Sequence, residues 1–589
     1  MLIKYSSPIR IFRVKFQLLI SKDMEKRWVE NKLNNQDTIT QLVDQLNINT
    51  IIAELLVNRG ITNYQEAEQF FRPKFSHTHD PFLMKDMDKA IARIKQAIEE
   101  NERILIYGDY DVDGTTSVAL VYSFFKPRYS NIDFYIPDRY KEGYGVSRDG
   151  IDYAAANNCK LIIALDCGIK ANDKVEYANS LGIDFIICDH HLPAEQIPNA
   201  VAVLDPKRID CPYPYKELSG CGIGFKLVQA FCISENIGLE QIEKLLDLVV
   251  VSIASDIVPV TGENRTLAYI GLEHLNKNPR PGLQALIEKT TCKELSVHEI
   301  VFSIGPRINA AGRIDHARLA VSLLIADDYK EAKLLCDTID TINTERKEFD
   351  QNITIEAIEM IENNSILRAK KSTVLYNKAW HKGVIGIVAS RLIDKYYRPT
   401  IILTESNGHA AGSARSVNGF DIYEAISACS DLLDQYGGHK YAAGLTMKIE
   451  NIPAFVERFE SIVSSTIQDN SLQQEISIES ELNLQEFNTK FYRILKQFAP
   501  FGPGNVKPVF ISRNVQLAAE LKVVGKLGDH LKFSVVQNGS YVFECIAYGL
   551  GHYKEILEQV SKFDICYCLE ENTWRDKTSI QLNIKDIRI

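Results

Sequence analysis

The feature that most constrains this chain is a series of acidic residues, each placed just after a short apolar run. Short apolar runs predict buried strands, and the helical patterns between them predict crossover helices. The runs 104–107, 161–165, 185–188 and 248–254 precede Asp109, Asp166, Asp189 and Asp256. This alternation favours an α/β fold with a doubly wound parallel sheet. Because parallel strands bring their carboxyl ends to one edge, we expect these aspartates to converge in one crevice.

A crevice with this many carboxylates requires cations, because like charges held close together repel each other. Mg²⁺ and Mn²⁺ prefer oxygen ligands in octahedral geometry, and Mn²⁺ also accepts imidazole. We therefore predict two Mn²⁺ or Mg²⁺ ions, about 3.5–4 Å apart, that act on a phosphate diester. Asp166 is the predicted bridging ligand. The other candidates are Asp109, Asp111, Asp113, Asp189 and Asp256, together with either His190 or His191.

Each part of this pattern has a simpler interpretation when it is taken alone. The segment 109–114 resembles a calcium loop, but the residues that follow do not supply the glutamate that such a loop needs. A single aspartate after a strand is usually a helix cap, and a histidine pair usually lies on the surface. The combination, at the ends of consecutive predicted strands, favours the metal site.

Composition narrows the function classes without selecting one. The chain has 589 residues, which predicts three or four domains, and no apolar run reaches the roughly 20 residues of a membrane span. Its net charge of −10 neither indicates nor excludes a nucleic-acid partner, since a local basic groove suffices. Twelve cysteines without a CxxC pair favour reduced thiols in a cytoplasmic protein and argue against structural zinc. The glycine pattern at 220–224 follows no apolar strand, which argues against a dinucleotide-binding oxidoreductase.

The remaining patterns divide the chain into regions. We expect a disordered extension at 1–23, helices at 24–85, the parallel-sheet lobe at 86–316, a long connecting helix at 317–365, a second, smaller α/β lobe at 366–465 and an OB-type β-barrel at 466–589. In the second lobe, 412–415 reads as a loop, 422–435 as a helix and 437–439 as a turn. In the barrel, Tyr541, Phe543 and Tyr548 are candidates for stacking on bases, although core packing explains them at least as well.

The triplet Asp189-His190-His191, in a chain that also carries DYDVDG at 109–114, resembles the DHH phosphoesterase superfamily and, within it, the RecJ single-strand-specific exonucleases. The match runs from about residue 24 to the end of the chain. It includes DPFLM at 80–84, YIPDR at 135–139, EGYG at 142–145, PRINAAGR at 306–313, GSARS at 412–416, GGH at 437–439 and PFGPGN at 500–505. One departure is Tyr107, near a position where relatives in the superfamily often have a histidine ligand; the aspartates take over that role here.

The resemblance implies Mn²⁺- or Mg²⁺-dependent hydrolysis of single-stranded DNA from its 5′ end to mononucleotides, in DNA repair and recombination. It assigns catalysis to Asp111, Asp113, Asp166, His190, His191 and Asp256. The implied metal ligands are Asp109, Asp111, Asp113, Asp166, His190 and Asp256, where Asp109 either binds directly or supports the loop. The implied substrate-binding residues are Arg139, Arg307, Arg313, Arg318, Ser413, Arg415, Gly438 and His439.

Two other functions stay open at this point. The same core could serve an oligoribonuclease or a cyclic-dinucleotide phosphodiesterase, but such enzymes do not need the barrel. A nucleic-acid scaffold without activity is also conceivable, but the intact acidic set argues against it. The resemblance further implies a helicase and a single-strand-binding protein as partners, a monomer, and no membrane association.

Overall fold

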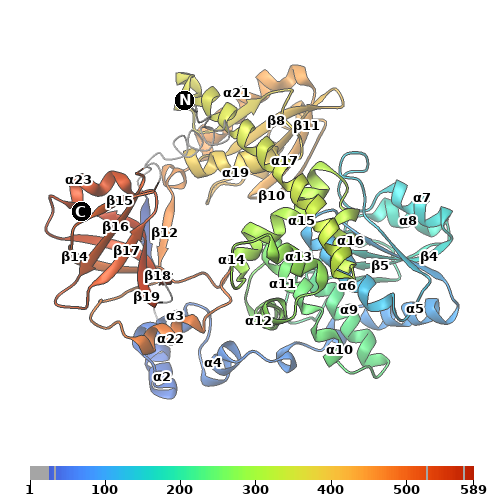
Figure 1. The fold of residues 1–589 in the computed structure, drawn as a ribbon. Coiled ribbons are helices and arrows are strands. Elements are labelled where there is room, and N and C mark those ends of the chain that lie inside the picture. Colours follow the sequence, from blue (N-terminus) through green and yellow to red (C-terminus); the bar gives the residue numbers. More distant parts are fainter. Residues whose placement is uncertain (1–25, 32–34, 526–527, 575–576) are drawn as a thin grey trace, which may run out of the picture.

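The computed structural model describes residues 26–31, 35–525, 528–574 and 577–589, so the predicted extension at 1–23 lies outside the described residues. Figure 1 shows three bodies: a first lobe around a parallel sheet, a second lobe and a C-terminal barrel. The helix α17 (Tyr329–Glu362) runs from the first lobe to the second, as the long connecting helix was predicted to do. None of the helices within the described ranges is long and apolar enough to cross a membrane.

The first lobe is built on five parallel strands in the order β3-β2-β4-β5-β6. Their bounds are β2 Arg103–Gly108, β3 Ile132–Tyr135, β4 Cys159–Leu165, β5 Asp184–Cys188 and β6 Ala202–Leu204. The strand order reverses at β2 and β4, and such a switch point opens a crevice at the carboxyl ends of the strands. The predicted doubly wound parallel sheet is therefore confirmed.

Both faces of the sheet are buried at its central strands β2, β4 and β5, which explains why these strands are apolar without alternation. Ile104 and Ile106 of β2 pack into the core formed with α5, α6 and α9, whereas Leu105 and Tyr107 pack into the core formed with α7 and α8. The covering helices are α5 Met87–Glu99, α6 Val112–Phe125, α7 Arg148–Ala156, α8 Asn172–Ser180 and α9 Gly220–Ser234.

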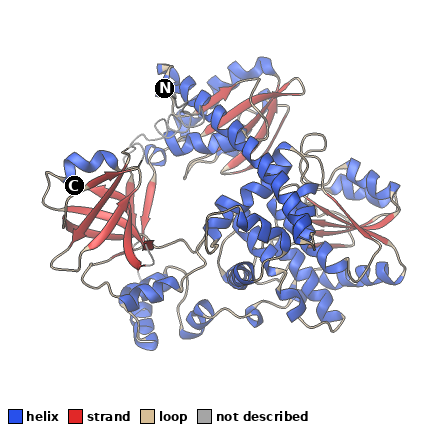
Figure 2. Cartoon of the chain, viewed as in Figure 1, coloured by secondary structure: helices blue, strands red, loops and turns tan. Residues whose placement is uncertain are grey.

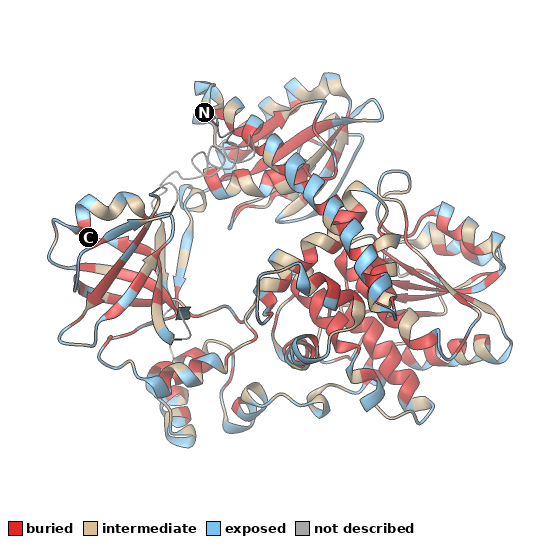
Figure 3. Cartoon of the chain, viewed as in Figure 1, coloured by how far each residue is buried: buried red, intermediate tan, exposed pale blue. Residues whose placement is uncertain are grey.

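The predicted strand at 248–254 is wrong, because this segment lies within the helix α11 (Leu246–Ser255). Its nine residues from Leu246 to Ala254 are all buried, and Figure 3 shows the interior helices of the lobe buried along their length. A short apolar run does not distinguish a strand from a helix that is buried on all sides. The other helices of this lobe are α10 Glu240–Glu243, α12 Gly262–Lys277, α13 Pro281–Glu288, α14 Val297–Glu299, the π-helical turn η3 Ile300–Ile304, α15 Gly305–Ile314 and α16 Arg318–Ile325.

The second lobe has a mixed sheet in the order β10-β11-β9-β8-β7. Its strands are β7 Thr373–Tyr376, β8 Thr400–Ser406, β9 His409–Arg415, β10 Gln435–His439 and β11 Ala442–Met447. Its helices are α18 Ser365–Ala369, α19 Ile385–Tyr396, α20 Ile422–Ser427 and α21 Ile452–Thr466, with 3₁₀ turns η4 Ser430–Leu432 and η5 Ile449–Asn451.

Three expectations for the second lobe are wrong. The loop at 412–415 belongs to β9, the turn at 437–439 belongs to β10, and the helix predicted to reach 435 ends at Ser427. Close packing explains the glycines, since a Cβ at Gly412 would lie 2.6 Å from Leu403, and a Cβ at Gly438 would lie 2.4 Å from the Ala442 carbonyl. Glycine therefore marks close strand contacts here rather than turns.

The C-terminal strands form a barrel, which Figure 2 shows as a compact group of strands. The order is β13-β14-β18-β19-β17-β16-β15, and an additional pairing of β14 with β16 joins the two sides. The elements are β12 Glu475–Ile478, β13 Ser480–Glu481, α22 Thr489–Lys496, β14 Phe510–Leu517, β15 Lys522–Val524, β16 His530–Val536, β17 Phe543–Ala547, α23 Lys554–Leu557, β18 Phe563–Trp574 and β19 Lys577–Arg588, with 3₁₀ turns η6 Asp469–Leu472 and η7 Gly551–Tyr553.

The N-terminal helices up to residue 71 pack on the barrel, whereas the 3₁₀ turns at 75–83 pack on the first lobe. Ile39, Leu42, Ile52 and Leu55 share one core with barrel residues such as Phe533. The strand β1 pairs in parallel with β12. The elements are β1 Arg27–Glu30, α2 Gln36–Leu46, α3 Thr50–Val57, α4 Tyr64–Phe71, and 3₁₀ turns η1 Phe75–His77 and η2 Pro81–Leu83.

Candidate metal centre

The loop between β2 and α6 supplies the first acidic side chains. Asp109 directly follows β2 and is fully buried; its Oδ1 accepts a long hydrogen bond from the Gly145 amide at 3.4 Å. Asp111 is the N-cap of α6 and accepts from the Gly114 amide at 3.0 Å. The helix cap thus orients the Asp111 carboxylate, and the end of β2 fixes the position of Asp109.

Asp113 is the most firmly held of these carboxylates. It lies in the first turn of α6, is 1% exposed, and accepts hydrogen bonds from the amides of Gly220 and Cys221 at 2.7 and 2.8 Å. The Ser252 hydroxyl of α11 donates a third hydrogen bond at 2.7 Å. Asp113 therefore joins the N-terminus of α9 and the helix α11 to the loop after β2.

His190 lies where the other acidic groups converge. Its Nε2 is 3.2 Å from Asp166 Oδ1, 3.5 Å from Asp256 Oδ2 and 3.7 Å from Asp113 Oδ2. Asp166 follows β4 in the left-handed region with φ 60°, and Asp256 ends the helix α11. Although Asp256 follows a helix rather than a strand, its carboxylate reaches the same point.

The donor set fits divalent cations. Asp166, His190 and His191, and likewise Asp113, His190 and Asp256, place ligand atoms within 4.8 Å of one another. Four buried atoms of the predicted ligands have no hydrogen-bond partner among the described residues: Asp166 Oδ1, Asp109 Oδ2 and both ring nitrogens of His190. Buried polar atoms are normally paired, so these unpaired atoms indicate ligands of a metal ion. Carboxylate oxygens with one imidazole suit Mn²⁺, and Mg²⁺ to a lesser extent.

Electrostatics supports this assignment. Burial, followed by the charge of Asp113, raises the pKa of Asp111, Asp166 and Asp256, and burial with the charge of Asp111 raises the pKa of Asp109. Burial lowers the pKa of His190. In the absence of cations, these carboxyl groups therefore hold protons more tightly than usual. Two divalent ions would offset the repulsion between the ionised carboxylates and the penalty of burying them.

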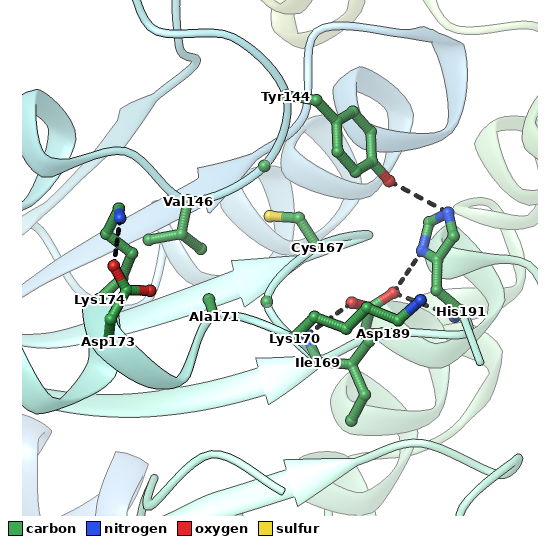
Figure 4. Close-up of a pocket in the computed structure, with 12 residues that line it drawn as sticks. Tyr144, Val146, Cys167, Ile169, Lys170, Ala171, Asp173, Lys174, Asp189 and His191 are labelled. Atoms are coloured by element: carbon green, nitrogen blue, oxygen red, sulfur yellow. Dashed lines mark hydrogen bonds and ion pairs between the residues drawn. The ribbon is translucent and has the colours of Figure 1, made fainter. Parts of the chain in front are cut away.

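His191 is positioned by a different set of contacts, which Figure 4 shows. Its Nδ1 is 2.7 Å from Asp189 Oδ1, and its Nε2 is 3.0 Å from the Tyr144 hydroxyl. Burial opposes the charge on both partners, but their mutual hydrogen bond prevails: the pKa of Asp189 is lowered to about 2 and that of His191 is raised to about 9. Beside this pair lies a cavity of about 280 Å³, lined by residues that include Tyr144, Val146, Cys167, Ile169 and Lys170.

A cluster of arginines lies between the two lobes. Burial, together with the nearby charges of Arg139, Arg346 and Arg415, lowers the pKa of Arg313 to about 9. Arg313 donates to the Gly383 carbonyl at 3.0 Å, and Arg415 donates to the Ser413 hydroxyl at 3.1 Å. No carboxylate among the described residues forms a salt bridge with Arg139, Arg313 or Arg415. Such a cluster without counter-ions is suited to an anion.

The first turn of α19 belongs to the same cluster. A Cβ at Gly386 would lie 2.8 Å from Ser413 Oγ and 2.9 Å from Arg415 Nη2, so the glycine admits both side chains to the helix N-terminus. His439 of β10 is near enough to Arg415 and His191 for burial and both charges to lower its pKa. The second lobe thus presents a helix N-terminus, a hydroxyl and guanidinium groups toward the first.

Three predicted substrate-binding residues have other contacts. Arg307 pairs with Asp340 at 2.9 Å and donates to the carbonyls of Ser303 and Lys289. Arg318 lies over the Phe134 ring at 4.5 Å. Gly438 lies in β10, where close packing against β11 accounts for it.

Sequence reasoning missed several features of this site. No local sequence pattern indicated that Arg346 or Gly386 belongs to the site. Asp189 was noted only as a possible ligand, and Tyr144 only as part of a motif, because their contacts with His191 are not visible in a sequence. Asp205 could have been found, because it directly follows the apolar run at β6. It is fully buried, its Oδ2 lacks a hydrogen-bond partner among the described residues, and burial raises its pKa to about 7.

Comparisons with known proteins agree with this geometry. Family models match three parts of the chain: the DHH family N-terminal domain at residues 103–253, the DHHA1 domain at 369–465 and the RecJ OB domain at 478–586. The metal-centre residues up to His191 lie in the first match. Ser413, Arg415 and His439 lie in the second.

Relatives match nearly the whole chain. The single-stranded-DNA-specific exonuclease RecJ of Bacillus subtilis is 37% identical over 96% of this chain and 71% of its own length. The Escherichia coli protein of the same name is 32% identical over 91% of this chain and 95% of its own length. A crystal structure of Thermus thermophilus RecJ with Mn²⁺ is 25% identical, with a TM-score of 0.82 over 96% of this chain and 79% of that one. The chain therefore belongs to the RecJ family of single-stranded-DNA-specific exonucleases.

Proposed function

We propose that this chain is a metal-dependent 5′→3′ exonuclease that hydrolyses single-stranded DNA to mononucleotides in DNA repair and recombination. The observation that carries the proposal is the set of buried ligand atoms of Asp109, Asp166 and His190 without hydrogen bonds, at the carboxyl edge of the sheet. The relatives named single-stranded-DNA-specific exonucleases, and the Thermus thermophilus structures with Mn²⁺ and with Mg²⁺, support the same activity.

Two divalent ions are the cofactors, Mn²⁺ or Mg²⁺. The residues that would hold them are Asp111, Asp113, Asp166, His190 and Asp256, with Asp109 as a further ligand or as a support of the loop. When bound, the ions neutralise the carboxylates and stabilise negative charge on the phosphate diester.

The side chains around the metal centre have separate tasks. His191, held by Asp189 and charged at neutral pH, offers a positive group beside the scissile phosphate. The Tyr144 hydroxyl fixes the other ring nitrogen of His191, so the imidazole has one orientation.

The arginine cluster between the lobes is the proposed site for the 5′ end of the strand. Arg313 and Arg415 are half-buried and have no carboxylate partners among the described residues, and Ser413 and the first turn of α19 lie beside them. A terminal phosphate would satisfy these donors bidentately. Arg139 completes the cluster, with its guanidinium 4.8 Å from the centre of the Tyr110 ring.

The barrel is the proposed contact for the rest of the strand. Tyr541 and Tyr548 are 84% and 60% exposed, whereas Phe543 is buried in the barrel core. Two of the three aromatic residues are therefore accessible to bases. This contact favours a long single strand over the short oligoribonucleotides or cyclic dinucleotides of the alternative function.

We further propose a monomer in the cytoplasm with a helicase and a single-strand-binding protein as partners. The domain limits 24–85, 86–316, 317–365, 366–465 and 466–589 belong to the same proposal. Sedimentation of the purified protein, alone and with a single-strand-binding protein, would test the oligomeric state and that partner.

The deciding experiment uses a 5′-phosphorylated, 3′-labelled single strand with Mn²⁺ or with a chelator, beside a duplex and a single-stranded RNA. Metal-dependent shortening from the 5′ end of the DNA strand alone is expected. Asp166→Asn should abolish it, while Asp469→Asn, which changes an exposed aspartate paired with Lys371, should not. Cleavage confined to dinucleotides would favour the small-substrate phosphodiesterases, and no cleavage at all would favour a scaffold.

A further inference from the structure

A buried arginine of the first lobe is surrounded by backbone carbonyls from other parts of the chain. Arg265 of α12 is 4% exposed, and no carboxylate among the described residues pairs with it. Its guanidinium lies 3.8 Å from the centre of the Phe70 ring. It donates to five carbonyls: Phe498 at 2.9 Å, Pro500 at 3.3 Å, Phe70 at 3.1 Å, Gln497 at 3.3 Å and Ala499 at 2.9 Å.

Four of these five carbonyls belong to the segment that leads from α22 into the barrel. The side-chain amide of Asn505 donates to two of them, those of Phe498 and Pro500, both at 2.8 Å. Asn505 Oδ1 accepts from Arg59 at 2.7 Å, and Arg59 also pairs with Glu479 at 2.7 Å. Residues 497–505, which contain the PFGPGN motif, are therefore fixed by side chains from both sides.

The same segment docks on the first lobe by its backbone. The Val260 amide donates to the Pro503 carbonyl at 2.7 Å. A Cβ at Gly502 would lie 2.4 Å from the Val260 side chain, so only glycine allows this approach. We call residues 497–505 with Val260, Arg265 and Arg59 the clamp. Figure 1 shows the clamp region between the barrel and the first lobe.

A buried charge without a counter-charge is costly to keep, and five carbonyl acceptors are an unusual way to satisfy it. Carbonyls on consecutive residues can meet one guanidinium only if the segment keeps one conformation. Arg265 therefore fixes the path of the segment by which the barrel is joined to the first lobe. Nothing in the metal centre or the arginine cluster uses this residue.

We infer that Arg265 is a positioning residue that holds the barrel in place for one long strand to bind the metal centre and the barrel together. This inference rests on the proposed function. Two linked sites bind a ligand tightly only when their separation matches its span, so a loosened clamp lowers the effective concentration of the barrel. A short substrate, which occupies the metal centre alone, does not depend on the clamp.

The test compares a long strand with a trinucleotide, both 5′-phosphorylated, using full-length protein with Mn²⁺. For Arg265→Met, KM for the long strand should rise roughly 10- to 100-fold, with kcat and KM for the trinucleotide nearly unchanged. Arg265→Lys keeps three donors for the five carbonyls, so its KM for the long strand should lie between those of Arg265→Met and the wild type. Lys277→Met, on the exposed side of the same helix, is the control, and it should leave kcat and KM unchanged for both substrates.

Gly502→Ala provides an independent variant, because it disturbs the clamp from the opposite side without removing a buried charge. It should also raise KM for the long strand and leave the trinucleotide kinetics nearly unchanged. In the double variant, its effect should not add to that of Arg265→Met. Equal losses on both substrates, or no loss with either variant, would overturn the inference.

Hydrogen exchange gives a readout that does not depend on activity. In Arg265→Met and Gly502→Ala, the amides of 497–505 should exchange faster, while those of α6 and α9 keep their protection. Unchanged exchange at 497–505 would also overturn the inference. If the wild type degraded no single-stranded DNA, the proposed function would fail, whereas exchange would still report whether the clamp exists.

Discussion

Replacing Asp256 by asparagine should stabilise the metal-free protein while it removes activity. Ligand atoms of Asp113 and Asp256 lie within 4.8 Å of each other. At an effective dielectric constant of about 20, two charges at that separation repel by about 3 kcal/mol. Asparagine has nearly the same shape as aspartate but carries no charge. Since Asp256 is partly exposed and takes up protons, we expect a net gain of about 1–2 kcal/mol at neutral pH.

The pH dependence has a defined sign. Burial and the charge of Asp113 raise the pKa of Asp256 in the folded protein well above 3.8. For a carboxyl group with a raised pKa, stability is greatest at low pH and falls as the pH rises from the unfolded value through the folded value. The advantage of Asp256→Asn should therefore vanish in acid, grow as the pH rises above about 4 and become constant above the folded pKa.

Urea denaturation with chelator and with Mn²⁺ would measure both effects. In chelator, Asp256→Asn should be more stable than the wild type. With Mn²⁺, the wild type should gain more stability than the variant, because the variant has lost a proposed ligand. A variant that is less stable in chelator, or that gains as much from Mn²⁺ as the wild type, would refute the reasoning.

Three further changes test other parts of the molecule. Asp189→Asn should lower kcat roughly 10- to 100-fold, because His191 loses the partner that orients it; an unchanged kcat would contradict this role. Arg415→Lys should raise KM about tenfold for strands with a 5′ phosphate but not for strands with a 5′ hydroxyl, since lysine lacks the bidentate geometry. Glu263→Gln should lower the free energy of unfolding by about 3–5 kcal/mol in urea, because it leaves the fully buried Lys226 without its ion pair; Lys226→Met in the same chain should recover part of the loss.

Much of the metal centre could be predicted because it follows from the geometry of parallel strands. The apolar runs at β2, β4 and β5 are buried on both faces, so they are continuous in the sequence, and the residue after each must lie at the same edge. Asp109, Asp166 and Asp189 directly follow these strands, and His190, one residue further on, was predicted with them. Asp256 was found with the wrong element, since an apolar run buried on all sides looks the same in a helix and in a strand.

The second lobe was harder to predict because its glycines have a tertiary cause. Gly412 and Gly438 look like turn residues until the neighbouring strands are known, and then they mark close approach. The arginine cluster was only partly predicted for a similar reason. Arg307 and Arg313 lie six residues apart in one motif, yet Arg307 pairs with Asp340 while Arg313 lies among other arginines.

By itself, the sequence determined the parallel sheet, the acidic groups at its edge and the barrel, because each follows from a local pattern of hydrophobic and polar residues. Only the tertiary structure decided which side chains meet. Residues far apart in the chain form the contact between Tyr144 and His191, the cluster around Arg313 and the set of carbonyls around Arg265. Such contacts leave no local pattern, because their energy arises only when separate elements pack together.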